Sequence, residues 1–147
     1  MPQSLIKVLV HIVFSTKNRA DLIPIEFEEE LYRYIHGIIE NNSARLIVAG
    51  GIANHIHLLI SIGKNDVPQL IGDIKRSTSL WMKKKGARDF YWQKGYGAFS
   101  IGQSQVADVT LYIRNQKDHH AKQDYKTEFR ALCGKYQVEI DERYCWD

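Results

Sequence analysis

The chain has 147 residues, of which 44% are apolar and 25% are charged, and its formal net charge is +3. This composition is typical of a globular protein and excludes disordered and collagen-like chains, so we expect residues 1–147 to form a single domain. No stretch approaches the roughly 18 apolar residues of a membrane-spanning helix. Two cysteines are too few for a secreted disulfide framework or a four-ligand zinc site, which favours a cytoplasmic protein.

The first half of the chain alternates strand and helix patterns. Residues 5–15 are rich in β-branched and aromatic types and predict a strand. From 25 to 41 the apolar residues recur at intervals of three and four, after Pro24, which predicts a helix. Two short β-rich runs, 45–49 and 55–62, then predict a hairpin that the Gly50-Gly51 pair interrupts.

The second half continues this alternation. Asp66 is placed to cap a helix that ends before Gly86, and 90–100 is typical of a broken strand. Ser104 is placed to cap a helix that continues to about His119, and a last amphipathic segment covers 126–136. The order β-α-β-β-α-β predicts an α+β fold of the split βαβ type, an antiparallel sheet with helices on one face and its other face free for a site.

The strand at 55–62 carries His55-Ile56-His57. Side chains alternate along a strand, so both histidines point to one face and the apolar residues, Ile56, Leu58, Ile60 and Ile62, point to the other. On the open face the two imidazoles are either structural histidines or a pair of ligands for a divalent metal. Leu59 stands where a histidine-triad hydrolase would carry its third histidine, and a second H-x-[TS] motif of a two-histidine phosphoesterase is absent from the sequence.

A second polar group lies on the helix expected after Ser104. Helical spacing places Tyr112, Gln116, His119 and His120 on one stripe. Alone, such a stripe could be a solvated face. Only about one tyrosine in a thousand is ionised at pH 7, so a free tyrosine is a weak nucleophile. Beside a metal site a tyrosine could still attack, because a metal bound to the target phosphate makes the phosphorus easier to attack.

Three segments together resemble a known family: HIVFSTKNR, NHIHLLISI and LYIRNQKDHH, in that order. The set is similar to the single-tyrosine HUH transposases (TnpA type) of the smallest bacterial insertion sequences and to their REP-associated relatives. The resemblance implies a ferredoxin-like HUH endonuclease fold with a C-terminal tyrosine-bearing helix. It also implies cleavage and rejoining of single-stranded DNA at hairpin-bearing ends, through a 5′-phosphotyrosine and a free 3′-hydroxyl.

The same resemblance assigns roles to residues. Tyr112 would be the nucleophile, His55, His57 and Gln116 the metal ligands, and His119 and His120 a support or a DNA contact. Imidazole favours Mn²⁺ over Mg²⁺, so we expect Mn²⁺ to bind more tightly and the more abundant Mg²⁺ to be the working ion. The phosphotyrosine would conserve the bond energy, and the sequence has no GxxxxGK[ST] loop, so no nucleotide cofactor is expected.

Basic residues predict the DNA surface. We expect eight of them to contact phosphates: Lys17, Arg19, Lys75, Arg76, Lys83, Lys84, Lys85 and Arg88. The run from Lys83 to Lys85, taken alone, could instead be a solvated face. The neighbouring aromatics Phe90, Tyr91, Trp92 and Tyr96 could stack on unpaired bases or belong to the core. His11 could lie near the metal pair, although a structural histidine with satisfied hydrogen bonds is the simpler interpretation.

The assembly prediction concerns the glycines at 95, 97 and 102, which precede the tyrosine helix and let the chain bend there. The resemblance favours a homodimer in which each active site combines His55 and His57 of one chain with Tyr112 and Gln116 of the other. Two alternatives stay open: a replication- or transfer-type HUH nuclease, and a ferredoxin-like nucleic-acid-binding module without catalytic activity.

Overall fold

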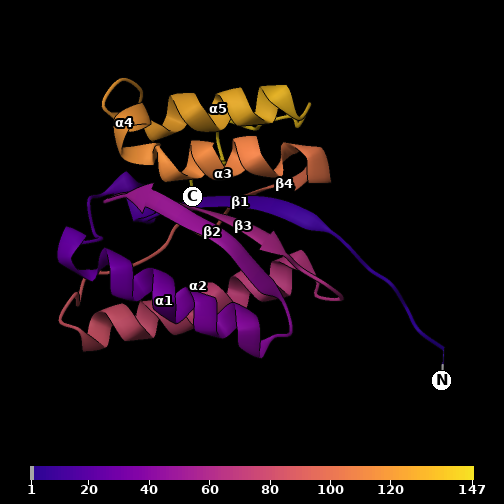
Figure 1. Cartoon of the computed structure of the whole chain (residues 1–147). Helices are drawn as coiled ribbons and strands as arrows, with labels where there is room; N and C mark the ends of the chain where they lie inside the picture. The colour runs from indigo at the N-terminus through magenta and orange to yellow at the C-terminus, as the bar shows by residue number, and fades with distance from the viewer. Residues whose placement is uncertain (1) are drawn as a thin grey trace.

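A computed structural model describes residues 2–147. Four strands form one antiparallel sheet in the order β2-β3-β1-β4, namely β1 Leu9–Ser15, β2 Arg45–Ile52, β3 His55–Ser61 and β4 Gly97–Ile101. Figure 1 shows helices on both sides of this sheet. α1 (Ile25–Asn41) and α2 (Val67–Lys84) lie on one side.

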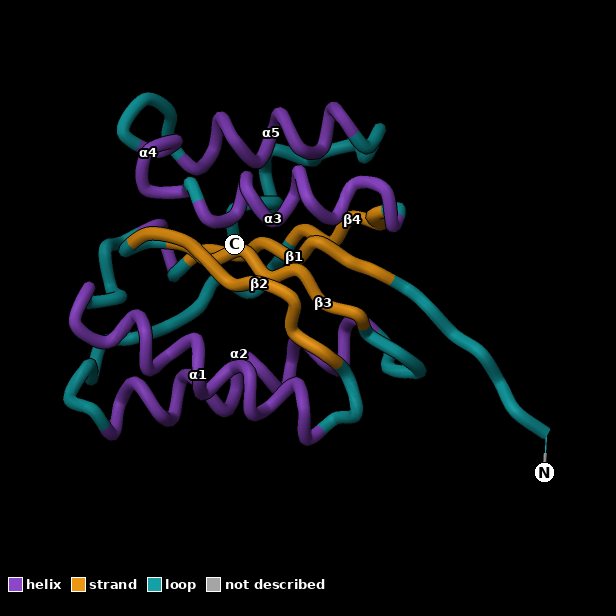
Figure 2. Tube along the Cα trace, in the orientation of Figure 1, coloured by secondary structure: helices purple, strands orange, loops and turns teal. Residues whose placement is uncertain are grey.

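The other side of the sheet is also covered (Figure 2). Three helices from the last third of the chain lie there: α3 Val106–Arg114, α4 Gln116–His120 and α5 Tyr125–Lys135. The sheet and its four-strand antiparallel topology confirm the predicted ferredoxin-like α+β fold. The expectation that the histidine-bearing face stays open is wrong, because the C-terminal helices close over it.

The face that carries α1 and α2 holds the main apolar core. Alternate residues of β1 and β3, among them Ile12, Phe14 and Ile56, are fully buried against apolar stripes of both helices. α2 begins where the sequence predicts, because the Asp66 side chain accepts a 2.8 Å hydrogen bond from the Gln69 N–H. The apolar alternation of the strands therefore fixes which face meets these helices.

Several predicted boundaries differ from the observed ones. β1 begins at Leu9 rather than residue 5, and β4 occupies only the end of the 90–100 segment and one residue beyond it. The helix predicted from Ser104 begins at Val106 after a short 3₁₀ turn over Gln103–Gln105, and it is broken at Asn115. Ser104 therefore caps nothing. Among residues 2–147, the structure contains no helix with both the length and the apolarity to cross a bilayer.

The glycine pair of β2 has a different function from the one predicted. The strand continues through Gly50 and Gly51 to Ile52, instead of ending there. A Cβ at Gly50 would collide with the carbonyl of Ile113, and one at Gly51 with the carbonyl of His55. Gly50 therefore allows close approach of α3 and Gly51 close approach of the β3 backbone, and neither ends the strand.

Candidate active site

β3 positions the two histidines of the motif side by side. His55 and His57 are completely buried on the face that α3, α4 and α5 cover. From the neighbouring strand, His11 Nε2 lies 2.8 Å from His57 Nδ1, so His11 is buried beside the pair with its hydrogen bond satisfied. Burial lowers the pKa of His57 to about 4 and that of His11 to about 3. Both rings are neutral at physiological pH.

α3 and α4 bring the second motif to the same place. α3 packs on β2, where Gly50 leaves room for the Ile113 carbonyl, and this contact carries Tyr112 over the histidines. The ring centroids of Tyr112 and His57 are 5.7 Å apart. Gln116, at the start of α4, places its Oε1 3.0 Å from His55 Nε2. The structure thus assembles Tyr112, Gln116 and both motif histidines from one chain.

The adjacent histidines of α4 have different environments. His120 has a side chain that is only 3% exposed, and its Nε2 lies 2.9 Å from Glu128 Oε1. His119 is one-third exposed at the edge of the site, with its Nε2 3.5 Å from Glu128 Oε2. Of the two predicted supporting residues, His120 therefore lies inside the cluster and His119 at its rim.

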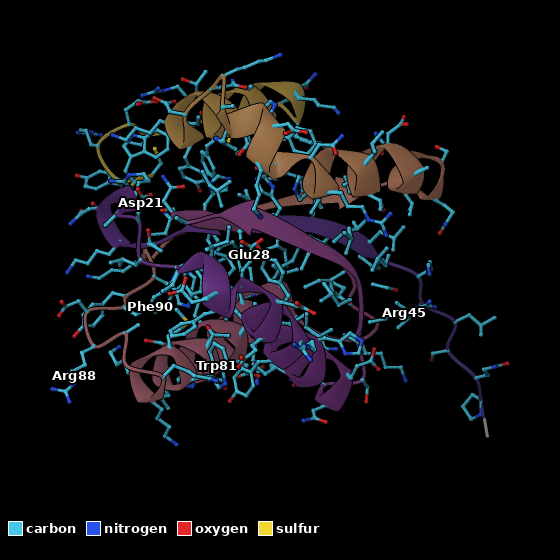
Figure 3. The ribbon with its side chains drawn as sticks, turned by 60° about the vertical axis from the view of Figure 1, so that its left-hand side comes forward. Asp21, Glu28, Arg45, Trp81, Arg88 and Phe90 are labelled. Carbon is cyan, nitrogen blue, oxygen red and sulfur yellow. The ribbon has the colours of Figure 1, made fainter. Side chains whose placement is uncertain are left out.

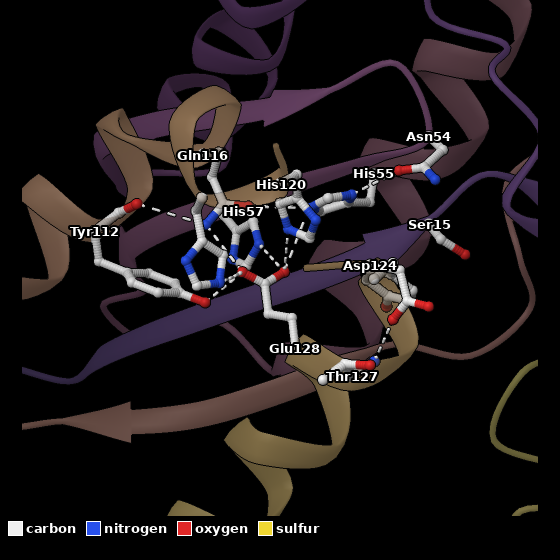
Figure 4. Close-up of polar contacts among 12 residues, drawn as sticks. Ser15, Asn54, His55, His57, Tyr112, Gln116, His120, Asp124, Thr127 and Glu128 are labelled. Atoms are coloured by element: carbon white, nitrogen blue, oxygen red, sulfur yellow. Dashed lines mark hydrogen bonds and ion pairs between the residues drawn. The ribbon is translucent and has the colours of Figure 1, made fainter. Parts of the chain in front are cut away.

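Glu128 of α5 is at the centre of the site, and the sequence prediction missed it. Its side chain is 1% exposed, and Figure 4 shows its carboxylate between the Tyr112 hydroxyl and the imidazoles. Burial opposes ionisation, but hydrogen bonds from His120 and His57 outweigh it and hold the pKa of Glu128 far below its usual range. One signal in the sequence could have identified it: Glu128 is a charged residue on the apolar face of its helix, beside Tyr125 and Phe129. Charged residues are rarely buried unless they are paired.

The amides of Asn54 and Gln116 determine which atoms around His55 donate hydrogen bonds and which accept them. Asn54 Nδ2 donates to the Arg19 carbonyl, so its Oδ1 faces His55 Nδ1 at 2.7 Å and fixes the proton there. The Nε2 of His55 is then an acceptor, yet it faces two oxygens, Gln116 Oε1 at 3.0 Å and Glu128 Oε1 at 3.4 Å. Converging acceptors repel one another unless a cation lies between them.

The donor set fits a divalent metal. Ligand atoms of His55, His57, His120 and Glu128 lie within 4.8 Å of one another, and Gln116 adds an amide oxygen. Imidazole, carboxylate and amide donors suit a divalent ion such as Mn²⁺.

The nucleophile candidate is half-buried and protonated. Burial raises the pKa of the Tyr112 hydroxyl, and its hydrogen bond to the Glu128 carboxylate raises it further. A cavity of about 380 Å³ reaches this side chain, with walls that include Val109, Leu132 and Tyr136. Tyr112 is therefore a phenol at neutral pH, and it stands where a ligand can reach it.

The predicted DNA-contacting residues fall into two groups. Four make contacts within the protein: Lys75 donates to the carbonyls of residues 93–95, Arg76 pairs with Asp73, Lys85 pairs with Glu30, and Arg19 donates to the Trp146 carbonyl. Within residues 2–147, no ion pair and no hydrogen bond to a carbonyl is made by the side chains of the other four, Lys17, Lys83, Lys84 and Arg88. Lys83 donates instead to Ser79 Oγ at 2.9 Å. Figure 3 shows Arg88 pointing away from the body of the protein.

The aromatic residues near α2 differ in their exposure to solvent. Phe90 and Trp92 are buried in the core, whereas Tyr91 is 52% exposed. The ammonium groups of Lys83 and Lys17 lie 4.1 and 5.7 Å from the centroid of the Tyr91 ring. The Lys17–Tyr91–Lys83 patch is therefore an exposed ring between two cations.

Comparison with known proteins identifies the relatives of this architecture. A family model described as "Transposase IS200 like" matches residues 4–116. The transposases for insertion sequence element IS200 from Salmonella typhimurium and Salmonella typhi are each 28% identical to this chain over 114 residues, which cover 72% of this chain and 74% of theirs.

Solved structures agree with the fold. A candidate transposase of Deinococcus radiodurans R1 superposes with a TM-score of 0.62 at 19% identity, over 79% of this chain and 95% of its own. A REP-associated tyrosine transposase bound to a REP hairpin also gives 0.62, at 14% identity over 82% of this chain and 73% of its own. The family match covers most of the chain and confirms the resemblance found in the sequence. The chain belongs to the family of IS200-like transposases.

Proposed function

We propose that this transposase cleaves and rejoins single-stranded DNA with Tyr112 as its nucleophile. The observation that carries the proposal is the position of the Tyr112 hydroxyl against the buried cluster of His55, His57, Gln116 and Glu128. In cleavage the Tyr112 oxygen bonds to phosphorus and the bond from phosphorus to the 3′-oxygen breaks. The phenol proton is lost from Tyr112, and the 3′-oxygen ends as a hydroxyl.

The metal ligands in this proposal are His55, His57 and Gln116, with His120 beside them. A bound Mg²⁺ or Mn²⁺ would act as a Lewis acid on the phosphate. The chain contributes the orientation: Asn54 fixes the tautomer of His55, and the Gln116 amide bridges His55 and Glu128. Because Tyr112 is protonated, activation of the target rather than a preformed phenolate suits this site.

The proposed substrate is a single strand that carries hairpins. A structural relative binds a REP hairpin, and this supports a hairpin as the recognised element. Lys17, Lys83, Lys84 and Arg88 would neutralise phosphates, and Tyr91 would stack on an unpaired base. Lys75 is removed from the predicted set, because its ammonium group already donates three hydrogen bonds to the chain.

The assembly of the site stays open to experiment. One chain supplies every residue of the cluster, which supports a site completed in cis. Exchange of the tyrosine helix within a homodimer stays a prediction of the resemblance. Mixed dimers of Tyr112→Phe and His55→Ala subunits separate the two arrangements, because they contain one intact site if the helix is exchanged and none if it is not.

The function is tested by trapping the covalent product. Wild-type protein, hairpin-bearing single strands and Mn²⁺ should give a protein–DNA adduct that survives boiling in detergent. The Tyr112→Phe variant should bind the same DNA and give none. A non-catalytic binding module would give no adduct with either protein, and an adduct of Tyr112→Phe at wild-type yield would reject Tyr112 as the nucleophile.

A further inference from the structure

Glu128 is a buried charge to which the proposed function above assigns no chemical role. It belongs to α5, and the family match ends at residue 116, before this helix begins. The rest of the buried face of α5 is apolar apart from the Tyr125 hydroxyl, so an aliphatic residue would fit the pattern at 128 better than a carboxylate. A carboxylate in this position requires compensation by its neighbours.

The two carboxylate oxygens face different partners (Figure 4). Oε1 lies 3.0 Å from His57 Nε2, 2.9 Å from His120 Nε2 and 3.4 Å from His55 Nε2. Oε2 accepts the hydrogen bond of the Tyr112 hydroxyl and a 3.0 Å bond from Gln116 Nε2. One oxygen thus faces the imidazoles of the metal site, and the other faces the nucleophile.

The charge of Glu128 has no permanent cation beside it. Within residues 2–147, all its ion-pair partners are histidines, and neither lysine nor arginine is among them. The imidazoles hydrogen-bond this carboxylate but bring no fixed positive charge, and buried carboxylates are normally paired with a cation as well. A divalent ion shared with the histidines would supply that charge.

We propose that Glu128 is a bridging residue of the active site, an inference that rests on the function proposed above. Through Oε1 it is a ligand of the divalent metal together with His55 and His57, and through Oε2 it positions the Tyr112 hydroxyl. α5 is then a part of the catalytic unit. β3 carries the two histidines, and α5 couples the metal that they would hold to the nucleophile.

The first test measures metal affinity without DNA. Mn²⁺ titrations followed by electron paramagnetic resonance should give a dissociation constant at least about tenfold higher for Glu128→Gln than for wild type. Glu139→Gln, which removes an exposed carboxylate elsewhere, is the matched control and should bind Mn²⁺ as wild type does. Equal Mn²⁺ affinity of Glu128→Gln and wild type would overturn the proposed ligand.

The second test concerns the tyrosine. At saturating Mn²⁺ and DNA, the single-turnover rate of adduct formation should fall at least about tenfold in Glu128→Gln, with the dissociation constant for hairpin DNA unchanged. An unchanged rate would reject the positioning role. Weaker DNA binding with an unchanged saturating rate would reject it too, because that result assigns Glu128 to DNA binding instead.

A measurement on wild-type protein covers the case in which Glu128→Gln does not fold. Crystals soaked in Mn²⁺ should show anomalous density within about 2.5 Å of Glu128 Oε1, and an ion bound only by the histidines would contradict the proposal. These results are independent of the proposed function. A wild type that binds Mn²⁺ at Glu128 but forms no adduct would reject the cleavage reaction and leave the ligand assignment in place.

Discussion

The two faces of the sheet use the same strands for different purposes. On the face of α1 and α2, Ile12, Phe14 and Ile56 are buried in an apolar layer. At the alternate positions of the same strands, Val13, His55 and His57 face α3, α4 and α5, and the centre of that layer is polar. The alternation of strand side chains thus separates the layer that stabilises the fold from the layer that would carry the chemistry.

Polar contacts between side chains, rather than apolar packing, hold the centre of the polar layer. Each buried side-chain nitrogen and oxygen of the described residues has a polar atom at hydrogen-bonding distance. Apolar contacts lie on each side of this cluster, around Ile113 on α3 and around Phe129 on α5. Substitutions on the two faces should therefore have different consequences.

The largest effect on stability should come from the apolar face. Phe14 is fully buried, with Trp92 4.9 Å from it between ring centroids. Phe14→Ala should lower the free energy of unfolding by about 3–5 kcal/mol, as measured by urea denaturation. The fraction that stays folded should bind Mn²⁺ as tightly as wild type, whereas a specific loss of metal affinity would show that the two faces are coupled.

Metal binding should stabilise the polar face. At a free Mn²⁺ concentration about 100 times the dissociation constant, the free energy of unfolding should rise by about 2.7 kcal/mol, since only the folded chain assembles the ligands. The rise should vanish in His57→Ala and in excess chelator. An equal rise in His57→Ala would place the bound Mn²⁺ elsewhere on the protein.

A smaller effect should separate the basic residues. Lys75→Met removes three hydrogen bonds to backbone carbonyls and should cost about 2 kcal/mol of stability. Lys84→Met, at an exposed lysine, should change stability by less than about 0.5 kcal/mol. Thermal unfolding of both variants measures the difference, and equal losses would contradict the different environments of the two lysines.

The smallest effect concerns the DNA surface. If Lys83 neutralises one phosphate, Lys83→Met should reduce the slope of log affinity against log salt by about 0.7 for a single strand. Fluorescence anisotropy over a range of salt concentrations measures this slope. Lys64→Met, which removes a lysine outside the predicted DNA surface, is the control, and an identical slope for Lys83→Met and wild type would remove Lys83 from the interface.

Much of the fold was predictable because its signals are local. The cap at Asp66, the apolar stripes of α1 and α2 and the alternation around His55 and His57 each depend on residues close together in the chain. The i and i+4 spacing of Tyr112 and Gln116 also predicted their shared face, although the helix breaks between them at Asn115.

The remaining features depend on contacts between distant segments. Glu128 is an ordinary helix residue in the sequence and enters the site only because α5 folds over the sheet. Lys75 carries the same charge as Lys83, but its neighbours in space include the carbonyls of residues 93–95. The closeness of Gly50 to Ile113 likewise follows from the docking of α3.

The identity of the nucleophile is the central claim, and peptide mapping tests it most directly. The adduct formed with Mn²⁺ and a hairpin-bearing single strand is digested with nuclease and trypsin, and mass spectrometry locates the remaining nucleotide. The account predicts a 5′-phosphate linkage on Tyr112. A nucleotide on Tyr125, which is buried beside His55, or on any other residue would contradict it.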